Sequence, residues 1–176
     1  SLEGRADPAL IGNVVHDNRK AGLAFFDKSG GKSRENTIRG NGYHGLRVAG
    51  KAAPVLTENQ VADNGRHGLV YRDRAGGRAA DNRMYGNQGN GVLARGRATP
   101  ELYRNSLSRN SESGLVVAGR AEPLVQGNTA DGNGVHGLAV TDWAEPGLIE
   151  NNAVNNEQNG MAYFDSAAGR AEGNVA

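Results

Sequence analysis

The chain has 176 residues, of which 27 are glycine, 5% are aromatic and none is cysteine. Its net charge of +1 argues against bulk nucleic-acid binding, and the missing cysteines exclude disulfides and thiolate metal ligands. No apolar run approaches the ~18 residues of a membrane span, so we expect no membrane partner. The mean hydropathy of -0.60 is typical of disordered chains, but the regular spacing of the apolar residues predicts a folded solenoid.

The chain repeats every 23 residues without an insertion or a deletion. The first asparagine series is Asn13, Asn36, Asn59, Asn82, Asn105, Asn128, Asn151 and Asn174. The second, five residues later, is Asn18, Asn41, Asn64, Asn87, Asn110, Asn133 and Asn156. A glycine series follows at Gly22, Gly45, Gly68, Gly91, Gly114, Gly137 and Gly160. These series define about seven and a half coils.

In chain order, each coil contains three short segments of alternating apolar residues. In the coil from Asn36 to Asn59 these apolar residues are Ile38, Leu46, Val48 and Leu56. Period-two alternation is typical of strands. A leucine-rich repeat would need an L-x-x-L-x-L frame and a helical return, which the half of the coil rich in Asn and Gly lacks. We therefore predict an all-β, single-stranded right-handed parallel β-helix with three strands per coil, forming one domain over residues 1–176.

The two asparagine series have a structural explanation. Asparagine tolerates the left-handed conformation of a tight turn, and we expect glycine to meet the same backbone demand. Stacked coils also place identical side chains about 4.8 Å apart, so their amides can hydrogen-bond as a ladder. We therefore assign the asparagines to the fold and not to catalysis.

Two apolar columns compensate each other in volume. Coils with Phe25, Tyr71 or Tyr163 on one strand carry Ser33, Ala79 or Ala171 eight residues later. The other coils pair Val48, Ala94, Val117 or Val140 with Leu56, Leu102, Val125 or Leu148. Coils of the first kind turn through Gly30-Gly31, Gly76-Gly77 or Ala168-Gly169, and the others through Pro54, Pro100, Pro123 or Pro146. A constant interior cross-section predicts that both columns face the lumen.

Stretches such as NGYHGLRVAGKAAPVLTENQVADNGRHGL resemble the right-handed β-helix repeats of the pectate-lyase-like superfamily, in the variant named for carbohydrate-binding proteins and sugar hydrolases. The two coil types are similar to repeats in an F-box-only protein and in bacterial multi-domain proteins. The resemblance implies the fold. It also implies that enzymes of this class build their clefts from long inserted loops, which this chain lacks.

We predict no catalytic residue, metal site or cofactor within these residues. Asp27 and Asp73 share one phase but lie two coils apart, about 9.6 Å by the ladder spacing, which is too far for a shared calcium. His44 and His67 share a phase on adjacent coils and lack a third metal ligand. We expect the two carboxylates at a solvated turn and the imidazoles as stacked, exposed turn residues.

A basic column is the main candidate for ligand binding. It consists of Arg5, Lys28, Lys51, Arg74, Arg97 and Arg120, with Trp143 at the same phase of the next coil, and it is widened by Arg47, Arg72 and Arg95. One interpretation is a linear site for an acidic polysaccharide, with Trp143 as a stacking platform. The alternative is that Asp27, Asp73, Glu122 and Glu145 neutralise the column.

A second candidate surface is the outward strand column Ala24, Arg47, Val70, Leu93, Val116, Ala139 and Ala162. Because it is unexpectedly apolar, Val70, Leu93 and Val116 are candidates for contact with a protein partner. The alternative is that β-propensity alone selects these residues.

The sequence thus favours a non-enzymatic scaffold or binding module for a protein or an acidic polysaccharide. The alternative is a fragment of a carbohydrate-active enzyme, a lyase or an epimerase, whose catalytic loops lie outside this segment. Neither terminus carries a cap, so we expect a piece of a longer protein and end-to-end self-association.

Overall fold

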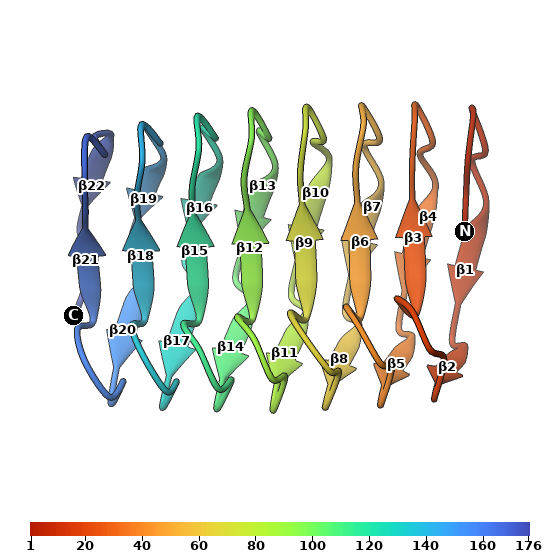
Figure 1. The fold of residues 1–176 in the computed structure, drawn as a ribbon, viewed down its shortest axis with the longest axis horizontal. Coiled ribbons are helices and arrows are strands. Elements are labelled where there is room, and N and C mark those ends of the chain that lie inside the picture. Colours follow the sequence, from red (N-terminus) through yellow and green to blue (C-terminus); the bar gives the residue numbers. More distant parts are fainter.

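The computed structural model describes residues 1–176 as a solenoid of 22 three-residue strands (Figure 1). Sheet 1 contains β1 (Ala9–Ile11), β4 (Lys32–Arg34), β7 (Val55–Thr57), β10 (Arg78–Ala80), β13 (Glu101–Tyr103), β16 (Leu124–Gln126), β19 (Gly147–Ile149) and β22 (Arg170–Glu172). Sheet 2 contains β2 (Val14–His16), β5 (Thr37–Arg39), β8 (Gln60–Ala62), β11 (Arg83–Tyr85), β14 (Ser106–Ser108), β17 (Thr129–Asp131) and β20 (Asn152–Val154). Sheet 3 contains β3 (Leu23–Phe25), β6 (Leu46–Val48), β9 (Leu69–Tyr71), β12 (Val92–Ala94), β15 (Leu115–Val117), β18 (Leu138–Val140) and β21 (Met161–Tyr163).

All strand pairs are parallel, and each residue pairs with the one 23 positions further along the chain. Leu23 pairs with Leu46, and Leu46 pairs in turn with Leu69. The coils therefore stack along one axis, with the two chain ends at opposite ends of the solenoid (Figure 1). This confirms the predicted all-β solenoid with three strands per coil.

The lumen is filled by the alternating apolar residues. In β6 the first and third side chains are buried and the second is half-buried, whereas in β7 only the central side chain is buried. Tyr71 and Ala79, a large and small pair from the two compensating columns, are both fully buried. In the last coil, Tyr163 is 40% exposed because no further coil covers it.

Both asparagine series form the predicted hydrogen-bonded ladders. Asn36 Nδ2 donates to Asn59 Oδ1 at 3.0 Å, and Asn59 Nδ2 donates to Asn82 Oδ1 at 2.9 Å. In the second series Asn64 Nδ2 donates to Asn87 Oδ1 at 2.9 Å. Side-chain amides thereby connect the coils at two corners of the cross-section.

The prediction that the ladder asparagines and the glycine series occupy their positions because the turn needs the left-handed conformation there is wrong. The left-handed residue is the one before each ladder asparagine, as at Asp81 (φ 58°) and Asp63 (φ 52°). The glycine series is required for space: a Cβ on Gly68 would lie 2.7 Å from the Gly91 carbonyl oxygen of the next coil. The turn residue therefore takes the strained conformation, and the asparagine that follows is left free to bond along the stack.

Candidate functional site

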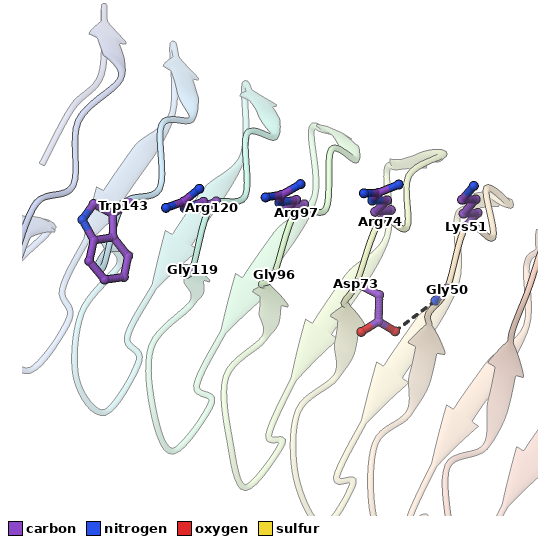
Figure 2. A pocket seen from close by; sticks show the side chains of 9 residues that line it. All are labelled: Gly50, Lys51, Asp73, Arg74, Gly96, Arg97, Gly119, Arg120 and Trp143. Atoms are coloured by element: carbon purple, nitrogen blue, oxygen red, sulfur yellow. Dashed lines mark hydrogen bonds between the residues drawn. The ribbon is translucent and has the colours of Figure 1, made fainter.

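The basic column lies at the turn that follows each strand of sheet 3. The residue before each member of the column has a positive φ, as at Gly50 (72°), Asp73 (63°) and Gly96 (77°). The Gly50 amide also donates to Asp73 Oδ2 at 3.1 Å, which holds adjacent turns together. Because every turn repeats this geometry, the next side chain always leaves the solenoid in the same direction (Figure 2).

These side chains and the residues before them line a shallow, open surface groove that runs parallel to the axis, here termed the basic groove. It has a volume of 720 Å³, and its charged and aromatic lining residues are Lys51, Asp73, Arg74, Arg97, Arg120 and Trp143. Figure 2 shows the four cationic side chains in a row that ends at the indole of Trp143, which is 61% exposed. The guanidinium carbon of Arg120 lies 6.0 Å from the indole centroid.

The cations of the basic groove have no ionic partner. No carboxylate oxygen lies within 4.0 Å of Lys51, Arg74, Arg97 or Arg120. None of the four carboxylates of the alternative, Asp27, Asp73, Glu122 and Glu145, forms an ion pair with these cations, although Asp73 lines the groove and Glu122 lines a second pocket together with Arg74, Arg97 and Arg120. Asp27 and Asp73 instead accept backbone amides, from Gly4 at 3.0 Å and from Gly50 at 3.1 Å.

The remaining predicted basic residues lie elsewhere. Arg5 and Lys28 are exposed in the first two coils of the same column, outside the groove lining. Arg47, Arg72 and Arg95 line a separate pocket of 90 Å³ on sheet 3. The structure thus divides the predicted set into a groove and a pocket that have no lining residue in common.

Two histidines line this pocket together with the arginines. The rings of His44 and His67 stack with centroids 5.3 Å apart and an interplanar angle of 12°, as predicted from their shared phase. The expectation that they are exposed is wrong, because each is only 6% exposed.

The histidines belong to a third polar ladder that the sequence interpretation missed. Its members are His44, His67, Asn90, Ser113, His136 and Asn159, and each side chain from His67 onward faces the backbone amide of the next member. The amide of Asn90 donates to His67 Nδ1 at 2.8 Å, whereas the buried His44 Nδ1 has no partner. Hydrogen-bonding side chains at one phase in six successive coils were the available signal.

Both imidazoles are neutral near pH 7. Burial, followed by the charges of His67 and Arg66, lowers the pKa of His44 to about 3. Burial, followed by the charges of Arg66 and Arg95, lowers the pKa of His67 to about 4. Since His67 Nδ1 accepts a backbone hydrogen bond, the hydrogen-bond network assigns its proton to Nε2.

The predicted apolar surface on sheet 3 differs from expectation. Val70 is only 3% exposed and lines the arginine-rich pocket, so its expected outward exposure is wrong. Leu93 and Val116 are half-buried. The face that they share with Arg47 is therefore partly covered by longer side chains and is not an open apolar patch.

The chain contains no group of three or more His, Asp or Glu side chains that could hold a metal ion. None of its elements is a helix long and apolar enough to cross a membrane. The two arrangements described above are both rich in hydrogen-bond donors and cations, and both are suited to binding anions.

Two solved structures are similar to this chain. The A-module of the Azotobacter vinelandii mannuronan C-5 epimerase AlgE4 matches with a TM-score of 0.74 at 17% identity, covering 97% of this chain and 55% of that one. The AlgE6 A-module from the same organism matches with a TM-score of 0.64 at 14% identity, covering 93% and 58%. The chain thus spans a little over half the length of either module and shares their fold.

No curated protein matches this sequence. The family model described as the right-handed β-helix region matches residues 45–176. With the parallel three-sheet stack and the asparagine ladders, this match shows that the chain belongs to the right-handed β-helix family.

Proposed function

We propose that this chain is a binding module for an acidic polysaccharide, which lies along the solenoid axis in the basic groove. The observation that carries the proposal is the row of four cations on adjacent coils with no carboxylate oxygen within 4.0 Å. Like charges held on neighbouring coils about 4.8 Å apart repel by about 1 kcal/mol per pair even in water. A polyanion in the groove would replace this repulsion by attraction.

The repeat of the groove suits a uronate polymer. The groove offers one cation per coil, and a uronate chain carries one carboxylate per sugar. Several carboxylates of one chain could therefore engage Lys51, Arg74, Arg97 and Arg120 together, and such multivalent binding tolerates weak individual contacts.

Trp143 extends the groove at its C-terminal end. Its indole is exposed and beside Arg120, so a sugar ring could pack its C–H face on the aromatic surface while its carboxylate contacts the guanidinium. The two similar structures are named as mannuronan epimerases, which are proteins that act on a uronate polymer, and this supports the choice of ligand class.

A second candidate is that the chain is part of a carbohydrate-active enzyme, a lyase or an epimerase, with catalytic loops outside these residues. The observation in its favour is that the chain spans only 55% of the length of the AlgE4 A-module. Against catalysis by this segment alone is the constant 23-residue coil, which inserts no loop to enclose a substrate.

The test is a titration with mannuronate oligomers followed by the fluorescence of Trp143, the single tryptophan of the chain. We expect binding at low ionic strength that weakens as salt is added, and an affinity at least ten-fold lower in the R74Q/R97Q variant. The matched control is Arg83→Gln, an exposed arginine on sheet 2, which should bind within two-fold of wild type.

A neutral 1,4-linked glucan should not bind. Absence of binding to the uronate oligomers at low ionic strength would overturn the proposal. If the oligomers gain the ultraviolet absorbance of an unsaturated uronate on incubation, this segment itself cleaves the polymer, and the proposal of a module that only binds is overturned.

A further inference from the structure

The arginine-rich pocket on sheet 3 collects positive charge in a small volume. Four of its lining residues are arginines, and none is acidic; the arginines are Arg47, Arg66, Arg72 and Arg95. Only Arg72 has a carboxylate nearby, with its Nε 3.4 Å from Asp73 Oδ1. A cluster of guanidinium groups with one such contact is far from neutral.

The other polar groups that line the pocket add donors without adding charge. His44 and His67 are neutral, and the one N–H that His67 can offer to a ligand is on Nε2. His44 Nδ1 is buried and unpartnered. The Tyr43 hydroxyl accepts from the Arg66 guanidinium, which lies 5.1 Å from the Tyr43 ring centroid and is fixed as a wall of the pocket.

One carboxylate lies at the rim. Glu112 Oε2 is 3.8 Å from His67 Nδ1, too far for a hydrogen bond, and that nitrogen already accepts from Asn90. With a neutral ring this contact is not an ion pair, and Glu112 is about half exposed. It therefore leaves the four guanidinium charges largely uncompensated.

We propose that this pocket binds a single oxyanion group, a carboxylate, sulfate or phosphate, through the guanidinium groups of Arg47, Arg72 and Arg95 and the Nε2–H of His67. The volume of 90 Å³ is several times the ~10–15 Å³ that one bound water requires, so the pocket has room for a small oxyanion. Guanidinium groups bind such anions through paired N–H donors with fixed geometry.

The pocket is independent of the basic groove, since the two have no lining residue in common. Each can therefore be disabled alone. Arg95→Gln removes a guanidinium from the pocket, whereas Arg83→Gln on β11 removes one that lines neither the pocket nor the groove. Both residues are exposed, so they form a matched pair.

The experiment is a calorimetric titration of the full chain with sodium sulfate at constant ionic strength maintained with chloride. We expect saturable binding with one site per chain, at least ten-fold weaker binding in R95Q, and binding within two-fold of wild type in R83Q. The absence of saturable binding, or equal affinities of R95Q and wild type, would overturn the inference.

A second variant guards against loss of structure. His67→Asn preserves the third ladder, because asparagine occupies this position in the next coil and Asn90 Oδ1 accepts the Ser113 amide at 2.9 Å. H67N should melt like wild type and bind sulfate several-fold more weakly. Unchanged sulfate affinity in H67N would remove the imidazole from the proposed site.

Competition identifies the source of the oxyanion. If mannuronate oligomers displace sulfate in wild type but not in R95Q, the pocket binds one carboxylate of a polymer. If sulfate binds and the oligomers do not displace it, the pocket serves a free ion. Both results uphold the site, and the titration of R74Q/R97Q with mannuronate oligomers shows separately whether the groove has failed.

Discussion

At the scale of single residues, the side-chain amide of asparagine explains how one coil is joined to the next. Asn82 Nδ2 donates to Asn105 Oδ1 at 3.0 Å and to the Leu56 carbonyl at 2.9 Å. Asn82 Oδ1 accepts hydrogen bonds from Asn59, both from its side-chain Nδ2 and from its backbone amide. A donor and an acceptor on one short, buried group are both required. Neither aspartate nor alanine provides both.

Replacement of one ladder asparagine should therefore be costly. We expect Asn82→Ala to lower the free energy of unfolding by about 3 kcal/mol or more, because it strands several buried donors and acceptors at about 1–3 kcal/mol each. Urea denaturation measures this. The control is Asn152→Ala on the exposed face of β20, which should change stability by less than about 0.5 kcal/mol. Equal effects of the two variants would refute a stabilising role for the ladder.

The buried histidines predict how stability depends on pH. Their folded-state pKa values of about 3 and about 4 lie below the unfolded value of 6.5. A histidine whose pKa is lower in the folded chain stays neutral there at pH values at which the unfolded chain already binds a proton. The free energy of unfolding therefore decreases as the pH falls from the unfolded-state pKa toward the folded-state pKa, by up to about 1.4 kcal/mol per pH unit for each histidine. We expect the urea concentration at the midpoint of unfolding to decrease as the pH is lowered from 7 to 5.

The matched variant for this prediction is H44N/H67N, which keeps hydrogen-bonding side chains in the third ladder. Its urea midpoint should vary less over the same pH range, since the two imidazoles with a lowered folded-state pKa are gone. If the urea midpoints of wild type and the double variant change in parallel with pH, then carboxylates, and not these histidines, control the loss of stability in acid.

At the scale of elements, close approach of neighbouring coils determines where each strand of sheet 3 begins. Gly68 precedes β9, and a Cβ there would also lie 3.0 Å from Asn87 Nδ2, in the second ladder. Gly76, in the turn before β10, has 3.7 Å to the nearest atom that such a Cβ would meet. The same residue type thus has different roles at the two positions.

The two glycines can be compared directly. Gly68→Ala should destabilise the chain by more than about 2 kcal/mol, because backbone of the adjacent coil must move. Gly76→Ala should leave stability within about 0.5 kcal/mol of wild type, since neither space nor a positive φ opposes it. Thermal or urea unfolding measures the stability of both variants. If Gly68→Ala were as stable as wild type, the argument that the adjacent coil leaves no space for a Cβ would be contradicted.

At the scale of the whole molecule, the side walls and the ends of the solenoid differ in chemistry. Large exposed apolar side chains gather in the terminal coils, at Ile11 (56%) and Val14 (60%) near one end and at Phe164 (45%) and Val175 (60%) near the other. The last strands of sheets 1 and 3, β22 and β21, also have an unpaired edge, whereas β20 of sheet 2 is bridged to Val175. Such edges are templates for pairing with a second chain.

We therefore expect the 176-residue chain to associate end to end as its concentration rises. Sedimentation velocity should show a growing oligomer fraction in wild type and mostly monomer in V14K/V175K, because lysine at an edge opposes pairing. Trp143→Ser, which removes an exposed side chain from the wall, should associate like wild type. A wild-type chain that stays monomeric at high concentration would disprove this.

Much of the fold follows from the sequence because its 23-residue period is strict. Alternation of apolar residues specifies strands, and identical asparagines at one phase specify stacked coils, so the pairing of Asn59 with Asn82 follows from their spacing alone. The same periodicity predicted the row that contains Arg74 and Arg97, since one phase of the coil means one direction in space.

What the sequence alone determined, then, is the coil, its stacking and which residues share a column. The tertiary structure alone decided which outward-facing residues are covered, how the basic residues divide between groove and pocket, and which charges have no ion-pair partner. His67 and Val70 are buried because neighbouring coils supply longer side chains around them, and Asp73 bonds to the Gly50 amide and not to Arg74. These outcomes depend on distances between different columns, which a one-dimensional period does not specify.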